Sequence, residues 1–221
     1  MSKELCRGIQ KLLDKYVADP KPPLKFNNTF TLLIAVLLSA QCTDERVNKV
    51  TKILFERADS AEKMMLLPLE VIQEIIRPCG LSLRKSTAIK GLSEILVKRY
   101  RGEVPKTLKA LEELPGVGHK TASVILTQAF DKPAFPVDTH IFRAAHRWGL
   151  SQKKTREGVE KDLKRLFPKK DWARLHLQII LYARKFCPAK KHDLKGCPIC
   201  TFTKKTTTET TEHTEKEKRI L

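Results

Sequence analysis

The stretch "LPGVGHKTASVIL", residues 114–126, decides the fold that we expect. Gly116 and Gly118 stand one residue apart, and Lys120 follows them at the start of an apolar stretch with helical spacing. The helical pattern "TLKALEE" (107–113) precedes it, so the order is helix, tight turn, helix. Glycine adopts backbone angles closed to other residues and lets the main chain approach a partner closely. The stretch therefore predicts a hairpin between two helices.

The rest of the chain has the same helical patterning. The segment "TFTLLIAVLLSAQ" (29–41) is apolar on all faces, which is typical of a helix surrounded by other helices. Apolar residues recur at spacings of three and four in five further segments, which are 47–58, 68–76, 84–100, 155–167 and 171–186. No segment shows sustained alternation, and we predict an all-α fold.

The chain is strongly basic, with 43 Lys and Arg against 25 Asp and Glu and a formal net charge of +18. This balance favours a polyanionic partner, nucleic acid first and an anionic membrane second, over a merely basic soluble or ribosome-associated protein. The apolar run 30–40 is shorter than the roughly 20 residues that span a bilayer. Residues 1–15 are polar and mixed in charge and do not resemble a secretion signal, so we expect a cytoplasmic, nucleoid-associated protein.

The hairpin is a candidate phosphate-binding site. The N–H groups at the start of its second helix favour an anion, and such a grip contacts phosphates without reading bases. Lys120 has two interpretations: a further cation near phosphate, or a nucleophile. An amine at the positive end of a helix dipole is favoured in its neutral form, burial would act in the same direction, and a neutral amine can form a Schiff base with a sugar.

Four segments together resemble the helix–hairpin–helix family of base-excision DNA glycosylases, and in particular bacterial endonuclease III. They are "LLSAQCTDERVNKV" (37–50), "GEVPKTLKALEELPG" (102–116), "LPGVGHKTASVIL" (114–126) and "PAFPVDTHIFRAAHRWGL" (133–150). The resemblance implies an all-α protein with two helical subdomains that flank a DNA cleft. A central helical barrel with the hairpin would span residues 22–132, and a second subdomain would combine residues 1–21 and 133–202.

The resemblance also implies roles for individual residues. Lys120 matches the family's nucleophile, and Asp138 matches the aspartate that stabilises the sugar cation and moves protons. An aspartate directly before "THIFRAAHRW" is also what an ordinary helix N-cap requires. The other residues implied to contact DNA lie at the hairpin: Gly116, Val117, Gly118, His119, which stands where relatives usually have arginine, and Thr121.

Base-excision enzymes bring the target nucleotide out of the stack, and the emptied space must be filled. By resemblance, Gln41 and Leu81 fill it. Without the resemblance, Gln41 is interpreted as a polar helix end and Leu81 as ordinary loop packing. Cys42 departs from the family's usual alanine, which leaves the preference for the opposite base open.

The resemblance implies a bifunctional glycosylase and apurinic/apyrimidinic lyase that removes oxidised pyrimidines from duplex DNA by a Schiff base and β-elimination. We expect it to act on damaged pyrimidines and abasic sites as a monomer, with no membrane partner. A non-catalytic helix–hairpin–helix DNA-binding protein is the alternative. A third possibility, an adenine-mismatch glycosylase, is disfavoured by Lys120, by the absence of an acid in "LLIAVLL" and by the lack of a second, base-recognising domain.

The segment "CPAKKHDLKGCPIC" (187–200) departs from the four-cysteine [4Fe–4S] signature that the resemblance implies. Nine residues separate Cys187 from Cys197, and no cysteine follows Cys200. Three interpretations stay open: no metal, a [4Fe–4S] cluster with a non-cysteine ligand, or a zinc ion bound by three thiolates and an imidazole. The zinc ligands would be Cys187, His192, Cys197 and Cys200. From residue 203 to 221 the chain is rich in Thr, Glu and Lys, which predicts a disordered tail or an added contact segment of mixed charge.

Overall fold

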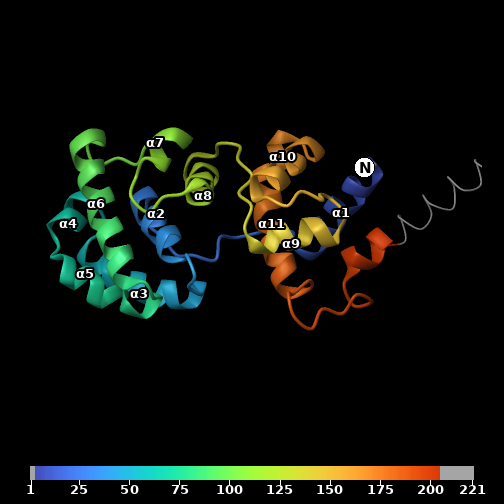
Figure 1. Ribbon diagram of the computed structural model, residues 1–221, viewed down its shortest axis with the longest axis horizontal. Helices are drawn as coiled ribbons and strands as arrows, with labels where there is room; N and C mark the ends of the chain where they lie inside the picture. The colour runs from blue at the N-terminus through green and yellow to red at the C-terminus, as the bar shows by residue number, and fades with distance from the viewer. Residues whose placement is uncertain (1–2, 205–221) are drawn as a thin grey trace, which may run out of the picture. The chain divides into compact units, whose positions relative to one another are not determined.

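The computed structural model describes residues 3–204, and every regular element within this range is a helix (Figure 1). This confirms the predicted all-α fold. The chain forms two compact units: a central unit, Pro22–Pro136, and a terminal unit that joins the residues up to Lys21 with those from Val137 onward. Residues 133–136, which the sequence analysis assigned to the second subdomain, group with the central unit. The boundary is set by contacts between residues far apart in the chain, which the local sequence near Pro133 does not record.

The central unit is built around α2. Nine of its ten residues are buried, and only its first residue, Thr29, is not. A capping box starts the helix: the Asn28 side chain accepts from the Thr31 N–H, and the Thr31 hydroxyl accepts from the Asn28 N–H. The other elements of the unit are α3 (Asp44–Arg57), α4 (Ala61–Leu66), α5 (Leu69–Ile76), η1 (Arg77–Cys79), α6 (Ser82–Tyr100), α7 (Leu108–Glu112) and α8 (His119–Phe130), and α2 itself spans Thr29–Leu38.

Two long-range packings shape the central unit. Helix α6 lies beside α4 and α5 (Figure 1), and α2 packs against α8. Helix α2 ends at Leu38, three residues before the predicted end at Gln41. A turn follows, in which the Ala40 N–H donates to the Leu37 carbonyl at 3.4 Å, and Gln41 has a left-handed backbone with φ 56°. The early end places residues 39–43 in a turn on the surface of the unit.

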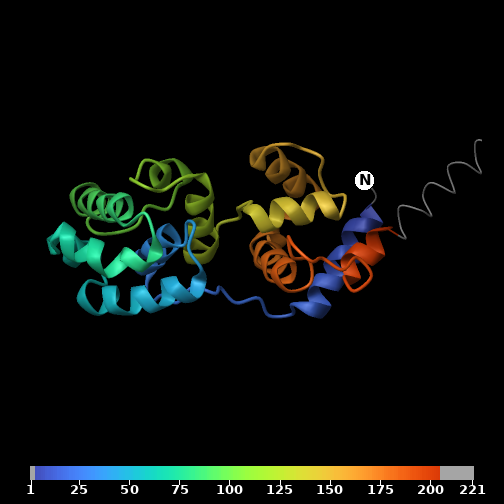
Figure 2. The same cartoon turned by 60° about the horizontal axis from the view of Figure 1, so that its bottom comes forward.

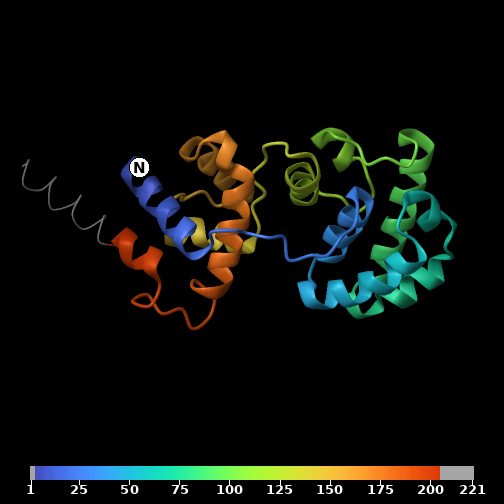
Figure 3. The ribbon, with the colours of Figure 1, turned by 180° about the vertical axis from the view of Figure 1, so that it is seen from behind.

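The terminal unit is built around α11 (Trp172–Lys185). Helix α11 packs against α9 (Thr139–Arg147), as Figure 2 shows, and against α1 (Lys3–Tyr16), as Figure 3 shows from behind. Tyr182 of α11 is fully buried, and its ring meets that of Trp148 edge to face with centroids 5.6 Å apart. The unit also contains α10 (Arg156–Leu166) and η2 (Lys169–Asp171).

The terminal unit ends, within the described residues, in a helical segment over 198–204. Thr203 is buried and its hydroxyl donates to the Cys200 carbonyl at 3.2 Å, so the disordered tail predicted from residue 203 does not begin there. The remainder of that predicted tail, 205–221, lies outside the described residues. Between residues 3 and 204, no helix combines the length and the apolar character needed to cross a membrane.

The two hairpin glycines differ in backbone conformation and in the space available for a side chain. Gly116 has φ +76°, and a Cβ placed on it would lie 2.8 Å from the Ala88 Cβ and 3.0 Å from the Leu37 Cδ1. The hairpin therefore packs directly on α6 and α2. Gly118 has φ −92°, and a Cβ there would meet nothing within 4 Å.

We predict that Gly116→Ala destabilises the protein much more than Gly118→Ala. The first substitution adds left-handed strain of about 1–2 kcal/mol and a clash in a packed interior, so we expect a loss of about 2–4 kcal/mol in all. Gly118→Ala, the matched control, should cost at most about 1 kcal/mol, because alanine is only a poorer N-cap. Urea unfolding measures both losses. Equal losses would contradict the packing argument.

Candidate active site

The hairpin presents the first turn of α8 without a side-chain cap. Gly118 is the N-cap residue of α8 and has no side chain to occupy the helix N–H groups. The side chain of Val117 is buried and its N–H donates to the Leu114 carbonyl at 3.0 Å, and its contact with DNA stays a prediction. Val117 therefore anchors the turn, and the first-turn amides of α8 are the ones available to an anion.

His119 and Lys120 both stand exposed in the first turn of α8. The His119 Nδ1 lies 2.8 Å from the Glu112 Oε1 at the end of α7, so the imidazole is part of an ion pair or hydrogen bond across the hairpin. The Lys120 side chain is exposed rather than buried. Thr121 is half-buried behind it.

Asp138 is the N-cap of α9. Its Oδ1 accepts from the His140 N–H and the Ile141 N–H, both at 2.8 Å. The capping interpretation is therefore correct, and the same bonds fix the direction of the carboxylate. Both bonds end on one oxygen, which leaves Oδ2 outside the cap. Asp138 is half-buried and belongs to the terminal unit, whereas Lys120 belongs to the central unit.

Gln41 and Leu81 share an unusual conformation. Both have left-handed backbones, with φ 56° and φ 50°, and both side chains are exposed, Leu81 to 52%. Left-handed conformations cost energy in residues other than glycine and tend to occur at functional turns. An exposed leucine in such a turn is not ordinary loop packing.

A buried lysine ties the two turns together. The Lys85 ammonium donates to the carbonyls of Leu38 and Ala40, which precede the turn at Gln41. It also donates to the carbonyl of Cys79, two residues before Leu81. These three distances are 2.9, 2.8 and 2.9 Å, and Lys85 is only 5% exposed. Burial lowers the pKa of Lys85. The structure thus brings together the turns of both predicted wedge residues.

Sequence reasoning missed Lys85, although one signal was present. Lys85 takes the place of an apolar residue on the face of α6 that continues through Ile89, Leu92 and Leu96. A lysine on a buried helical face has to find acceptors. The neighbouring thiol of Cys79 has its pKa raised to about 12, mainly by burial and then by a hydrogen bond with Cys42, so it stays protonated beside the ammonium.

The C-terminal loop gathers a second group of functional side chains. The donor atoms of Cys187, His192, Cys197 and Cys200 all lie within 4.8 Å of one another, and the three thiols are buried. The Sγ atoms of Cys187 and Cys200 are 3.9 Å apart, and the His192 Nε2 is 3.7 Å from the Cys200 Sγ. Four such donors in this arrangement are able to hold a metal.

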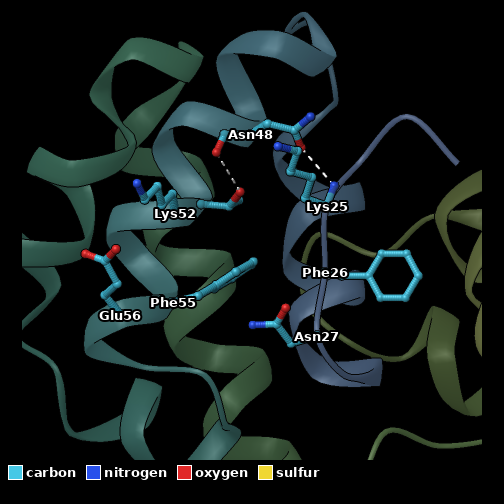
Figure 4. A pocket seen from close by; sticks show the side chains of 8 residues that line it. Lys25, Phe26, Asn27, Asn48, Lys52, Phe55 and Glu56 are labelled. Carbon is cyan, nitrogen blue, oxygen red and sulfur yellow. Dashed lines mark hydrogen bonds between the residues drawn. The ribbon is translucent and has the colours of Figure 1, made fainter.

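A pocket of about 340 Å³ lies elsewhere on the central unit, between residues 25–27 and α3 (Figure 4). The Lys25 N–H donates to the Asn48 Oδ1 at 2.9 Å and joins the two segments. None of the residues predicted for catalysis, DNA contact or metal binding lines this pocket.

The fold and the hairpin define a class: all-helical proteins that hold DNA through a helix–hairpin–helix. Residues 34–169 match the model of the HhH-GPD superfamily of base excision DNA repair proteins. Endonuclease III of Rickettsia conorii is 42% identical over 199 residues, covering 90% of this chain and 95% of that protein. Endonuclease III of Bacillus subtilis is 41% identical over 198 residues, covering 87% and 90%.

Solved structures agree with these relatives. A trapped endonuclease III–DNA covalent intermediate is 40% identical, with a TM-score of 0.87 over 90% of this chain and 94% of that one. A non-covalent endonuclease III–DNA complex is 39% identical, with a TM-score of 0.88 over 94% and 99%. The chain belongs to the HhH-GPD superfamily. It is a DNA glycosylase with apurinic/apyrimidinic lyase activity, an enzyme of base excision repair.

We predict that Lys85→Met destabilises the central unit by about 3 kcal/mol or more, because it leaves two buried carbonyls and a third, partly buried one without a donor. Its two turns should loosen, and binding to duplex DNA should weaken. Lys98→Met is the matched control: it removes an exposed lysine of the same helix, whose partner is Glu94, and should change stability by less than about 0.5 kcal/mol. Denaturant unfolding and hydrogen exchange at residues 39–43 and 79–82 measure the effect. Hydrogen exchange at the wild-type rate in these two turns of Lys85→Met would show that Lys85 does not hold them together.

Proposed function

We propose that this enzyme removes oxidised pyrimidines from duplex DNA, with Lys120 as the nucleophile of a Schiff-base mechanism. The observation that carries the proposal is the position of Lys120: exposed in the uncapped first turn of α8, directly after the glycine hairpin. A relative 40% identical to this chain has been trapped in covalent linkage with DNA. Covalent linkage requires a nucleophile, and an exposed amine beside a phosphate-binding turn is suited to that role.

Duplex DNA is the proposed partner. The net charge of +18 favours association with a polyanion. Amides of the first turn of α8 and the Gly118 N–H would bind phosphates of the backbone. Gln41 and Leu81, held exposed on turns that share the Lys85 ammonium, would fill the space that the extruded nucleotide leaves.

The proposed reaction begins with attack of the neutral Lys120 Nζ on C1′ of the deoxyribose. A C–N bond forms while the bond to the base breaks, and the base leaves with that electron pair and takes up a proton. Opening of the sugar ring then gives a Schiff base. Loss of a proton from C2′ expels the 3′ phosphate by β-elimination, and water hydrolyses the imine and releases Lys120.

Asp138 is the proposed carboxylate of this reaction. With Oδ1 fixed by the cap of α9, Oδ2 is the oxygen proposed to face the sugar. Its charge would stabilise the developing oxocarbenium ion and accept the proton of the lysine ammonium. This role requires Lys120 and Asp138 to reach the same deoxyribose. We further propose that the enzyme acts inside the cell, on the chromosome, and that the Cys187–Cys200 loop binds a metal in a structural role.

We predict that Lys120→Ala abolishes borohydride trapping of the protein on a duplex that contains thymine glycol, because no Schiff base can form. Binding to the same duplex should fall only a few-fold, since one of many phosphate-facing cations is lost. Lys109→Ala removes an exposed lysine from the other helix of the hairpin and is the matched control. Gel analysis of the trapped adduct is the measurement.

Two outcomes of the trapping experiment would overturn parts of the proposal. An undiminished adduct in Lys120→Ala would place the nucleophile at another residue. No adduct from the wild-type protein on any oxidised pyrimidine or abasic duplex, with binding intact, would favour the non-catalytic DNA-binding alternative.

We predict that Asp138→Asn separates the cap from the catalysis. Asparagine caps a helix about as well as aspartate, so stability should change by less than about 0.5 kcal/mol. Single-turnover base excision should slow by about 10²–10³-fold, because a preorganised charge is lost. Asp138→Ala should lose both properties. Excision by Asp138→Asn at the wild-type rate would limit Asp138 to the cap.

A further inference from the structure

We propose that Cys187, His192, Cys197 and Cys200 bind a single zinc ion, in place of the four-iron cluster that the family resemblance implies. This inference concerns a structural metal and deepens the proposed metal binding of the loop. It does not depend on the assignment of Lys120 or Asp138.

The separations of the donor atoms are those of one tetrahedral ion. Zn–S bonds of about 2.3 Å and Zn–N bonds of about 2.0 Å at tetrahedral angles place neighbouring donors about 3.5–3.8 Å apart. The Cys187 and Cys200 sulfurs are 3.9 Å apart, and the His192 Nε2 lies 3.7 Å from the Cys200 sulfur. All four donor atoms lie within 4.8 Å of one another. A single ion at their centre requires only small movements of these side chains.

A four-iron cluster does not fit the same donors. Such a cluster places a body of irons and sulfides between its ligands, so its cysteine sulfurs stand much farther apart than the ligands of one ion. It is normally held by four thiolates. This loop supplies three thiolates, and no cysteine follows Cys200 in the sequence. The fourth donor is the imidazole of His192, and three thiolates with one imidazole are an ordinary structural zinc set.

Two simpler accounts explain less of the geometry. Buried free cysteines are common in apolar cores, but packing alone does not bring the imidazole nitrogen of half-buried His192 to a sulfur. A disulfide between Cys187 and Cys200 would leave Cys197 and His192 without a role, and all three cysteines are free. The backbone supports convergence: Lys191 has φ +54°, a left-handed turn directly before His192.

The surroundings of the sulfurs suit thiolates. The Arg147 Nη1 donates to the Cys187 Sγ at 3.5 Å. The Ile199 N–H donates to the Tyr182 oxygen at 3.1 Å, and the Tyr182 hydroxyl lies 3.7 Å from the Cys197 Sγ, to which it would donate if that sulfur were a thiolate. Donors to ligand sulfurs are typical of metal sites. Zn²⁺ with three thiolates and a neutral imidazole carries a net charge of −1, which the Arg147 guanidinium offsets.

The zinc ion would close the loop between α11 and the helical segment 198–204. Four protein ligands fill the coordination shell, so the ion has no open position for a substrate and its role is structural. Closing the loop also fixes the exposed Lys190, Lys191 and Lys195, which project from it. Loss of zinc should therefore loosen the loop and weaken contacts of these lysines with phosphate.

The test is the metal content of the full-length protein, expressed in medium supplied with both iron and zinc. We expect one zinc per chain by elemental analysis, no stoichiometric iron or acid-labile sulfide, and no visible absorption. Replacement by Co²⁺ should give the intense ligand-field bands of tetrahedral coordination and thiolate-to-cobalt charge transfer. These readouts need no DNA and no activity, so they are independent of the trapping experiment.

Variants assign the ligands. A partner that only hydrogen-bonds a ligand changes metal affinity by about 10–100-fold, so His192→Ala, which removes a ligand, should lose at least that much in a chelator competition. His192→Cys should restore tight binding, and Lys190→Ala, an exposed neighbour in the same loop, should bind as the wild type does. Cys197→Ser should lose zinc, with Cys6→Ser as the control for removal of a buried thiol. If Cys197→Ser fails to fold, release of zinc from the wild-type protein by a mercurial thiol reagent tests thiolate ligation directly.

Three results would overturn the proposal. Iron and sulfide in stoichiometric amounts would show that a cluster forms. A folded protein without metal would show that the loop is held by packing alone. Unchanged zinc affinity in His192→Ala would remove His192 from the ligand set.

Discussion

Two arginines of α9 hold the terminal unit together by binding carbonyl groups at the C-terminal end of α11. Arg143 and Arg147 of α9 donate to the carbonyl of Cys187, at distances of 3.1 to 3.4 Å, and Arg143 also reaches the carbonyl of Ala183. Guanidinium groups at the end of a helix satisfy its last carbonyls and oppose its dipole. The carbonyl oxygens also solvate the partly buried guanidinium groups, and burial together with the nearby Arg147 lowers the pKa of Arg143.

These arginines connect two sites that the sequence places far apart. Helix α9 begins at Thr139, directly after the capping carboxylate of Asp138, and carries Arg143 and Arg147 toward its other end. Cys187 follows α11 and is the first of the four metal donors. The direction of the capping carboxylate and the position of the cysteine loop are therefore set by one helix.

In the central unit a single buried cation likewise binds carbonyl groups at the ends of two helices. Lys85 joins the end of α2 to the end of η1, and the turns beyond both of them are left-handed at Gln41 and Leu81. The hairpin is held separately, by the close approach of Gly116 to α6 and α2. In both places the main chain is held: three carbonyl groups by the Lys85 ammonium, and the backbone at Gly116 by contact with α6 and α2. The side chains that project from them, including the exposed Lys120, remain free to differ in chemistry without changing the fold.

The sequence by itself determined the helical fold, the hairpin, the cap at Asp138 and the four candidate metal donors. Each of these depends on residues close together in the chain, the metal donors within the single segment 187–200, and local spacing reports such relations directly. Helix ends were less accurate, since α2 stops at Leu38 where a left-handed turn follows. Only the tertiary structure decided that Lys120 is exposed, that Val117 is buried and that His119 meets Glu112.

The tertiary structure alone also revealed Lys85 and the convergence of His192 with the cysteines. The Lys85 ammonium binds a carbonyl 47 residues away, and no local pattern records which distant acceptor a buried donor will find. The four metal donors are close together where Lys191 has a left-handed backbone, a conformation that a lysine in the sequence does not predict. The physical reason is the same in both cases: a buried polar group must be satisfied, but its partner is chosen by the packing of whole helices rather than by its neighbours in the chain.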